Sequence, residues 1–170
     1  MKVTIFGGSL PDEETKKLAY EIGKRVGKKG YTLQNGGYTG VMEYSSKGCV
    51  EAGGKAIGFC IKDPNSKLKK MREPNLYSSK VIYSTDYRDR VKHLMNTDRI
   101  IVLPGQVGTL EEFFVAWVGA IIKDLHPIYV LGKKNKELFD FLLKKNFIKK
   151  DEHLPYIKYV DSIDKIDFLN

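Results

Sequence analysis

Short runs of β-branched residues alternate with amphipathic segments along the whole chain. The first run, Lys2 to Phe6, precedes a segment in which Ala19, Ile22 and Val26 share one helical face. The same alternation continues to the end of the sequence. It predicts strands at 2–6, 31–34, 56–61, 81–84, 99–103, 128–131 and 157–160, helices at 12–29, 41–52, 87–96, 109–125 and 136–145, and a last helical turn from residue 161.

Strands that alternate with crossover helices favour a mainly parallel sheet with helices on both faces, because right-handed crossovers place helices on each side. We therefore expect a Rossmann-like, doubly wound α/β fold. The length of 170 residues indicates a single domain, residues 1–170. In such folds, ligands bind beyond the carboxyl ends of the strands.

The composition is that of a globular protein, with 42% hydrophobic and 11% aromatic residues. No apolar run reaches the roughly 18 residues that a membrane-spanning helix needs. The amino terminus enters a strand pattern directly and lacks the features of a secretory signal, so we expect a cytoplasmic protein without a membrane partner.

The formal net charge of +8 raises the question of a nucleic-acid partner. The lysines, however, occur in scattered pairs such as Lys16–Lys17 and Lys149–Lys150, mixed with acidic residues, as on a solvated surface. This distribution argues against a polyanionic partner and leaves a small phosphorylated molecule as the leading ligand. Salt-sensitive retention on a polynucleotide would indicate the nucleic-acid alternative.

The sequence offers no metal site and implies no cofactor. Its two cysteines, Cys49 and Cys60, form no CxxC motif, and His93, His126 and His153 lack metal-ligand spacing. The GxGxxG fingerprint does not follow the first strand, and GxxxxGK[ST] is absent from the sequence. Ordinary nicotinamide dehydrogenases and P-loop ATPases are therefore disfavoured.

Three predicted strands end in glycine-containing loops that open a helix. Glycine lets backbone N–H groups approach an anion, and a helix amino terminus adds a favourable dipole, so such loops suit a phosphate. A parallel sheet brings all three loops to the same edge, which predicts a phosphate site there. The candidate substrate-binding residues in these loops are Gly7, Gly8 and Ser9; Gly36, Gly37, Thr39, Gly40 and Met42; and Pro104, Gly105, Gln106, Val107, Gly108 and Thr109.

The third loop, PGQVGTLEE, resembles the PGGxGTxxE signature of the LONELY GUY family, the cytokinin riboside 5'-monophosphate phosphoribohydrolases formerly called lysine decarboxylase-like. The resemblance spans nearly the whole chain. The opening IFGGS is similar to the family's first glycine turn, and NGGYTGVM is similar to its GGGxxGLM segment. The helix YRDRV resembles the family's helix with the catalytic arginine, and EEFFVAW its ELxxxW segment.

The resemblance implies a hydrolase that cleaves the N-glycosidic bond of a purine nucleoside 5'-monophosphate, whose base is possibly an N6-modified adenine, to free base and ribose 5-phosphate. It implies Glu112 and Arg90 as catalytic residues, the glycine loops as the substrate site, and a homodimer. The chemistry is compatible, because a carboxylate can stabilise the oxocarbenium character that develops as the bond breaks.

Several alternatives remain open. Thr109 to Glu112 also fits a T-x-x-E capping box, and Arg90 could be a surface residue paired with Asp86 or Asp89. Because the spacing to Asp98 is shorter than the family pattern, Arg88 is a second candidate for the site arginine.

Two other features leave the function open. Gln106 occupies the position of the family's second glycine, and molybdenum cofactor carriers bind a phosphorylated ligand on a related fold without cleaving it. A non-catalytic binder or carrier is therefore the alternative function. A basic loop with Lys67, Lys69, Lys70 and Arg72 either closes over a phosphate or is simply solvated.

Overall fold

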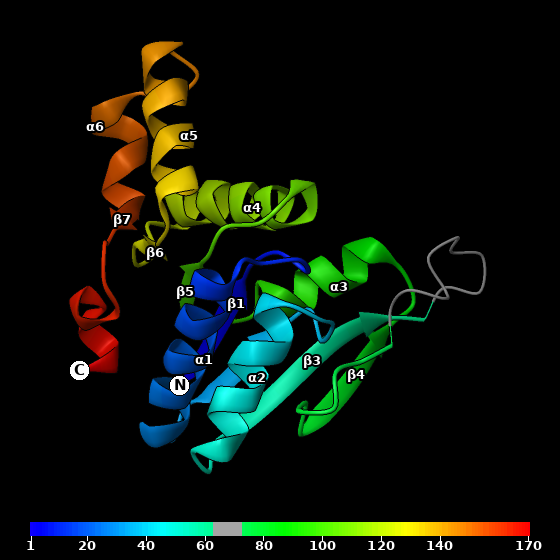
Figure 1. The fold of residues 1–170 in the computed structure, drawn as a ribbon. Helices are drawn as coiled ribbons and strands as arrows, with labels where there is room; N and C mark the ends of the chain where they lie inside the picture. Colours follow the sequence, from blue (N-terminus) through cyan, green and yellow to red (C-terminus); the bar gives the residue numbers. More distant parts are fainter. Residues whose placement is uncertain (63–72) are drawn as a thin grey trace.

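In the computed structural model, which describes residues 1–62 and 73–170, the strands form one parallel sheet in the order β4-β3-β2-β1-β5-β6-β7 (Figure 1). Every strand pairs in parallel with its neighbour within these ranges. The strands are β1 (Lys2–Phe6), β2 (Thr32–Asn35), β3 (Lys55–Ile61), β4 (Lys80–Ser84), β5 (Arg99–Val102), β6 (Ile128–Val130) and β7 (Ile157–Tyr159). The predicted Rossmann-like α/β fold is confirmed.

Helices cover both faces of this sheet. They are α1 (Glu13–Lys28), α2 (Val41–Glu51), α3 (Tyr87–Leu94), α4 (Val107–Lys123), α5 (Lys133–Lys144) and α6 (Lys150–His153), with 3-10 turns at Leu154–Tyr156, Ile163–Lys165 and Asp167–Leu169. The helices α1 and α2, with the last two 3-10 turns, pack on one face through Ile22, Val41 and Ile166. On the other face, α3, α4 and α5 bury Leu94 and an aromatic cluster that includes Phe113.

The strand order creates a switch point. The chain builds outward from β1 to β4 and then returns to place β5 on the other side of β1. The connections after β1 and β5 therefore diverge, and a crevice forms between them at the carboxyl ends of the strands. Ile5 of β1 pairs with Ile101 of β5, so the two strands end side by side.

The helices α5 and α6 extend away from the sheet as an arm, residues 133–153 (Figure 1). The indole N–H of Trp117 on α4 donates to the carbonyl of His153, 2.9 Å away, and so ties α6 to α4. The sequence pattern missed α6, because four residues are too few to show a helical period. No helix in the described ranges is long and apolar enough to cross a membrane.

Candidate functional site

The three glycine loops meet at the switch point and are joined through one residue. The N–H of Gly8 donates to the carbonyl of Pro104, 3.0 Å away, and the carbonyl of Gly8 accepts from the N–H of Val41, also at 3.0 Å. Gly8, after β1, is thus bonded to the loop after β5 and to the first residue of α2. The sheet edge predicted to carry the site is one continuous backbone assembly.

Two glycines in this assembly occupy places where a side chain would not fit. Gly40 has a φ of 73°, and a Cβ there would lie 2.5 Å from the carbonyl oxygen of Gly8. A Cβ on Gly36 would overlap the Nη2 atom of Arg90 and lie 2.7 Å from the sulfur of Met42. Glycine is therefore needed here for close approach, as the sequence suggested, although at Gly36 the neighbour is an arginine of the protein itself.

A buried ion pair lies beneath these loops. The Nη1 atom of Arg90 donates to Glu112 Oε1, 2.8 Å away, and its Nε donates to the carbonyl of Phe59 at 2.7 Å. Only 5% of Arg90 and 9% of Glu112 is exposed. The guanidinium carbon also lies 5.7 Å from the centre of the Tyr38 ring. The arginine is fixed on three sides, so the Glu112 carboxylate is held in one place next to a positive charge.

The structure separates the two arginines of α3. Arg88 is exposed, whereas Arg90 is buried with Val91 and Leu94. The alternative of Arg90 as a surface residue paired with Asp86 or Asp89 is wrong, because Arg90 is buried and pairs with Glu112. Asp86 instead caps α3 by accepting from the N–H of Asp89.

The capping-box interpretation of Glu112 is also wrong. The helix α4 begins at Val107, two residues before the predicted start, so Gln106 and not Thr109 is the residue before its first turn. Glu112 therefore lies in the second turn, beyond reach of the first backbone donors. Its carboxylate contacts Arg90 instead.

Within the described residues, the amino terminus of α4 offers backbone donors for an anion. The first N–H groups of any helix lack a partner within the helix, and Gln106 makes no side-chain capping hydrogen bond. Gly105, Gln106, Val107 and Gly108 are exposed, and a Cβ on Gly108 would meet no atom within 4 Å. Since Gly8 N–H and Gly37 N–H already donate to Pro104 and Asn35, these α4 groups are the donors best placed for an anion.

The remaining predicted positions differ in their exposure. Thr109 is buried beside Gly105, and Gly7 is buried against Val41. Ser9 and Thr39 are exposed, and Met42 is half-buried. The basic residues Lys67, Lys69, Lys70 and Arg72 lie outside the described residues.

Sequence reasoning missed the polar side chains that hold the second loop. The amide of Asn35 donates to the carbonyl of Met42 at 2.8 Å and to Ser46 Oγ at 3.0 Å, while its oxygen accepts from Gly37 N–H at 2.8 Å. Asn75 donates from its backbone N–H to Gly37 O and from its amide to Tyr38 O. A polar residue at the very end of a buried strand, as Asn35 is, was the available signal.

A second polar contact joins α3 to α4 beside the ion pair. The hydroxyl of Tyr87 donates to the carboxylate of Glu111. Burial and this neighbouring carboxylate raise the pKa of Tyr87 above its usual value, because both disfavour the phenolate. The phenol therefore stays protonated. In the described part of the chain, no cluster of three or more His, Cys, Asp or Glu could hold a metal ion.

A doubly wound parallel sheet with helices on both faces defines a Rossmann-like α/β protein. The profile of the SLOG cluster4 family matches residues 1–156, and the chain belongs to this family. The resemblance to the LONELY GUY group seen in the sequence is thereby confirmed at the level of the family.

The chain is similar to proteins with two different activities. It is 34% identical over 118 residues to a cytokinin riboside 5'-monophosphate phosphoribohydrolase of Mycobacterium tuberculosis, a match that covers 68% of this chain and 61% of the relative. The chain thus spans about three fifths of that enzyme's length.

Solved structures that are similar to this chain include proteins with a different named role. A molybdenum cofactor binding protein of Rippkaea orientalis superposes with a TM-score of 0.74 at 22% identity, covering 99% of this chain and 93% of the other. The molybdenum cofactor carrier protein of Chlamydomonas reinhardtii superposes with a TM-score of 0.70 at 21% identity, covering 99% and 96%. At these identities the likeness establishes the fold alone.

Proposed function

We propose that the protein hydrolyses the N-glycosidic bond of a purine nucleoside 5'-monophosphate, releasing the free base and ribose 5-phosphate. The observation that carries this proposal is the buried pair of Arg90 and Glu112 beneath the glycine loops. A carrier needs the loops but has no use for a carboxylate fixed at the site. The sequence similarity to a phosphoribohydrolase supports the same conclusion.

The geometry suggests a separate role for the amino terminus of α4, for Glu112 and for Arg90. The 5'-phosphate binds at the amino terminus of α4, where Val107 and Gly108 offer backbone donors and the helix dipole favours an anion. Glu112 then faces the sugar and stabilises the positive charge that develops at its anomeric carbon. Water adds its oxygen to that carbon, the bond to the base breaks, and the water proton leaves with the base. Arg90 positions the carboxylate through its fork of donors.

The direct test is incubation with a panel of nucleoside monophosphates while free base and ribose 5-phosphate are measured. Glu112→Gln should keep the fold, because the amide oxygen can still accept from Arg90, yet lower turnover by orders of magnitude because the charge is lost. Unchanged turnover in this variant would refute the role of Glu112.

The two arginines give a matched comparison. Arg90→Ala should abolish activity, whereas Arg88→Ala should leave most of it, since Arg90 donates to Glu112 while Arg88 is exposed. The reverse pattern would assign the role to Arg88.

The phosphate can be tested on the substrate. A nucleoside without its 5'-phosphate should lose about 3 to 4 kcal/mol of binding, or a factor of several hundred in kcat/KM. Gly108→Val, whose side chain would project into open space at the helix end, should remove this discrimination by blocking the anion. Equal cleavage of nucleoside and monophosphate would reject the phosphate site.

The second candidate function is a non-catalytic carrier of a phosphorylated ligand. The structural similarity to molybdenum cofactor carriers favours it, together with Gln106 in the loop. Tight binding of a monophosphate without any cleavage, in the wild type as well as in Glu112→Gln, would select this alternative.

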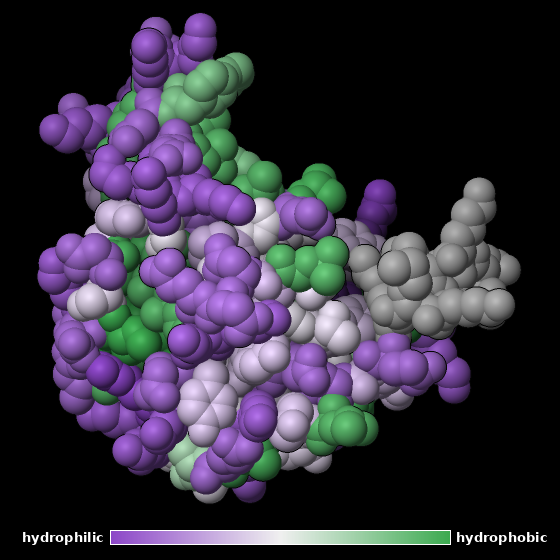
Figure 2. All heavy atoms as spheres, in the orientation of Figure 1, coloured by the Kyte–Doolittle hydropathy of each residue, from purple (hydrophilic) through white to green (hydrophobic). Residues whose placement is uncertain are grey.

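We also propose that the protein is a homodimer. Exposed apolar side chains follow one side of α4, and two more lie on or next to α5 in the arm, which carries hydrophobic groups along one side in Figure 2. They are Phe114, Val115, Val118, Ile122, Phe141 and Phe147. Such a surface is costly to leave in water. Sedimentation equilibrium should give a dimer for the wild type and a monomer for Ile122→Asp; a wild-type monomer would refute the proposal.

A further inference from the structure

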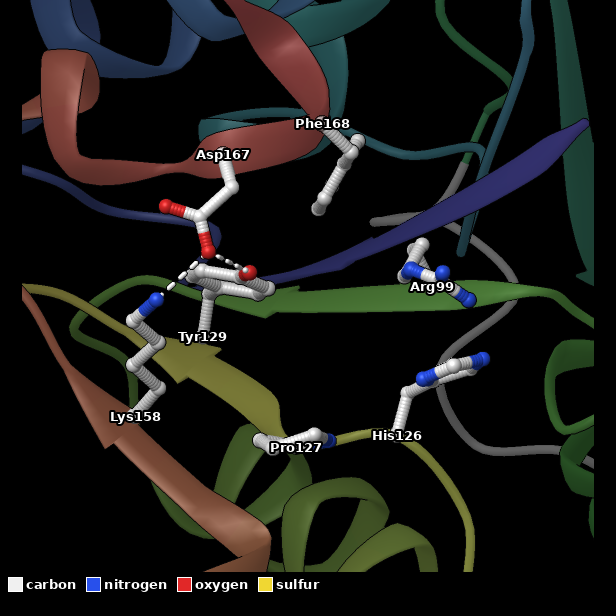
Figure 3. Close-up of a pocket in the computed structure, with 7 residues that line it drawn as sticks. All are labelled: Arg99, His126, Pro127, Tyr129, Lys158, Asp167 and Phe168. Carbon is white, nitrogen blue, oxygen red and sulfur yellow. Dashed lines mark hydrogen bonds and ion pairs between the residues drawn. The ribbon is translucent and has the colours of Figure 1, made fainter.

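A cavity of about 440 Å³ lies far from the glycine loops, near the amino ends of β5 and β6 (Figure 3). Arg99, which lines the cavity, is the first residue of β5, whereas the loop with Gly105 follows the other end of the same strand. The cavity and the candidate active site are therefore at opposite edges of the sheet. Besides His126 and Pro127, which precede β6, its walls are formed by Arg99, Tyr129, Lys158, Asp167 and Phe168.

The charges in this cavity do not balance. Lys158 Nζ lies 2.5 Å from Asp167 Oδ2, and the hydroxyl of Tyr129 donates to the same oxygen at 3.0 Å. This carboxylate is thus neutralised by the lysine. Arg99 donates from Nη1 to the carbonyl of Asp98 at 2.8 Å, but no carboxylate within the described ranges forms an ion pair with it. Among the described residues, the Arg99 guanidinium therefore adds one positive charge to the cavity that no ion pair neutralises.

The other walls are flat and apolar. The rings of Phe168 and Tyr129 pack edge to face, with centres 5.3 Å apart and planes at 73°. The guanidinium carbon of Arg99 lies 6.0 Å from the centre of the Phe168 ring. Figure 3 shows Arg99 and His126 at one end of the cavity, with Lys158 and Asp167 at the other and Phe168 above. A ring entering here meets an aromatic surface beside a cation.

The volume of the cavity indicates the size of ligand that it can hold. It falls within the roughly 300 to 1,000 Å³ of small-molecule sites, far more than an inorganic anion needs. We propose that this cavity is a second binding site, which takes a small aromatic or heteroaromatic anion. The ligand's ring packs against Phe168 and Pro127, and its negative group binds Arg99 and His126. This site does not depend on the reaction proposed for the glycine loops.

Phenyl phosphate is a suitable probe, because it joins a flat ring to an anion. Binding is measured by titration calorimetry, and its place by NMR shifts of the Tyr129 and Phe168 ring protons. We expect Arg99→Gln to weaken phenyl phosphate binding about tenfold or more, the loss of a charge-assisted contact. Lys17→Gln, which removes one charge from the exposed face of α1, should change it less than about twofold.

Two further binding measurements distinguish the proposed site from a simple phosphate site. Inorganic phosphate should bind at least about tenfold more weakly than phenyl phosphate, since it cannot use the aromatic wall. His126→Ala, at an exposed loop position where folding is not at stake, should weaken the probe about threefold.

Three results would overturn the proposal. They are unchanged affinity in both Arg99→Gln and His126→Ala, equal affinity for phosphate and phenyl phosphate, and shifts confined to residues 104–112. The last result would mean that the probe binds only at the candidate active site.

Discussion

Gly36→Ala tests whether the position of Arg90 controls the candidate active site. The substitution adds a single methyl group outside the ion pair. That methyl would overlap Arg90 Nη2 and lie 2.7 Å from the sulfur of Met42. The backbone of Gly36 does not adopt a positive φ, so the change acts through this contact and not through backbone strain. The arginine must move, because its Nη2 is the atom that the new methyl group would overlap.

The size of the effect follows from ordinary contact distances. Carbon and nitrogen atoms pack at about 3.5 Å or more, so Nη2 must move by about 1 Å or more. A shift of that size stretches the 2.8 Å contact with Glu112 beyond hydrogen-bonding range. Losing a charge-assisted hydrogen bond costs about 1.5 to 3 kcal/mol, and Tm falls by about 2 to 4 °C per kcal/mol in a domain of this size. We expect Tm to fall by about 3 to 12 °C.

The assay combines thermal unfolding with turnover of a nucleoside monophosphate. A catalytic group misplaced by about 1 Å can cost about a hundredfold in rate, so turnover should fall by that order. Gly119→Ala is the matched control: its Cβ meets no atom within 4 Å, and alanine inside α4 should stabilise the helix by about 1 kcal/mol without changing turnover. A Gly36→Ala variant with wild-type Tm and turnover would refute the reasoning.

Two other predictions concern buried groups. In urea unfolding, Arg90→Met should cost about 3 to 5 kcal/mol, because it removes the guanidinium that pairs with the buried Glu112 carboxylate. The double variant with Arg90→Met and Glu112→Gln should cost much less than the sum of the two single variants, and strict additivity would contradict an ion pair. Burial raises the pKa of Cys49 and Cys60 from 9.0 to about 11, so at pH 8 a thiol reagent should modify the native protein at least about a hundredfold more slowly than the unfolded chain. Because the unfolded thiols ionise first as the pH rises, stability should fall between about pH 9 and 11, and a flat pH profile there would count against the shift.

The fold was predictable because the hydrophobic period changes between strands and helices along the whole chain. The sequence pattern placed β1 at residues 2–6, as the structure has it. The ends of the helices were harder to predict from the sequence. The pattern began α4 at Thr109 because its apolar face starts there, but the helix includes Val107 and Gly108, which contribute nothing to that face.

The candidate site was predictable only in part, because a local pattern shows which face of a helix a residue lies on but not which distant segment it contacts. Helical rotation places Arg90 and Arg88 on different sides of α3, in agreement with their burial. The carbonyl of Phe59 and the ring of Tyr38, which hold the arginine, come from chain segments far away in the sequence. Local patterns contain no information on such contacts.

The two hydrogen bonds of Gly8 have a consequence for the motion of the site. Because Gly8 is hydrogen-bonded to Pro104 on one side and to Val41 on the other, none of the three loops can open alone without breaking a hydrogen bond of Gly8. Amide protons of Gly8 and Val41 should therefore exchange with solvent only when the loops separate together or the domain unfolds. A ligand entering such an edge meets donors that are already in place, and little ordering entropy is lost when it binds.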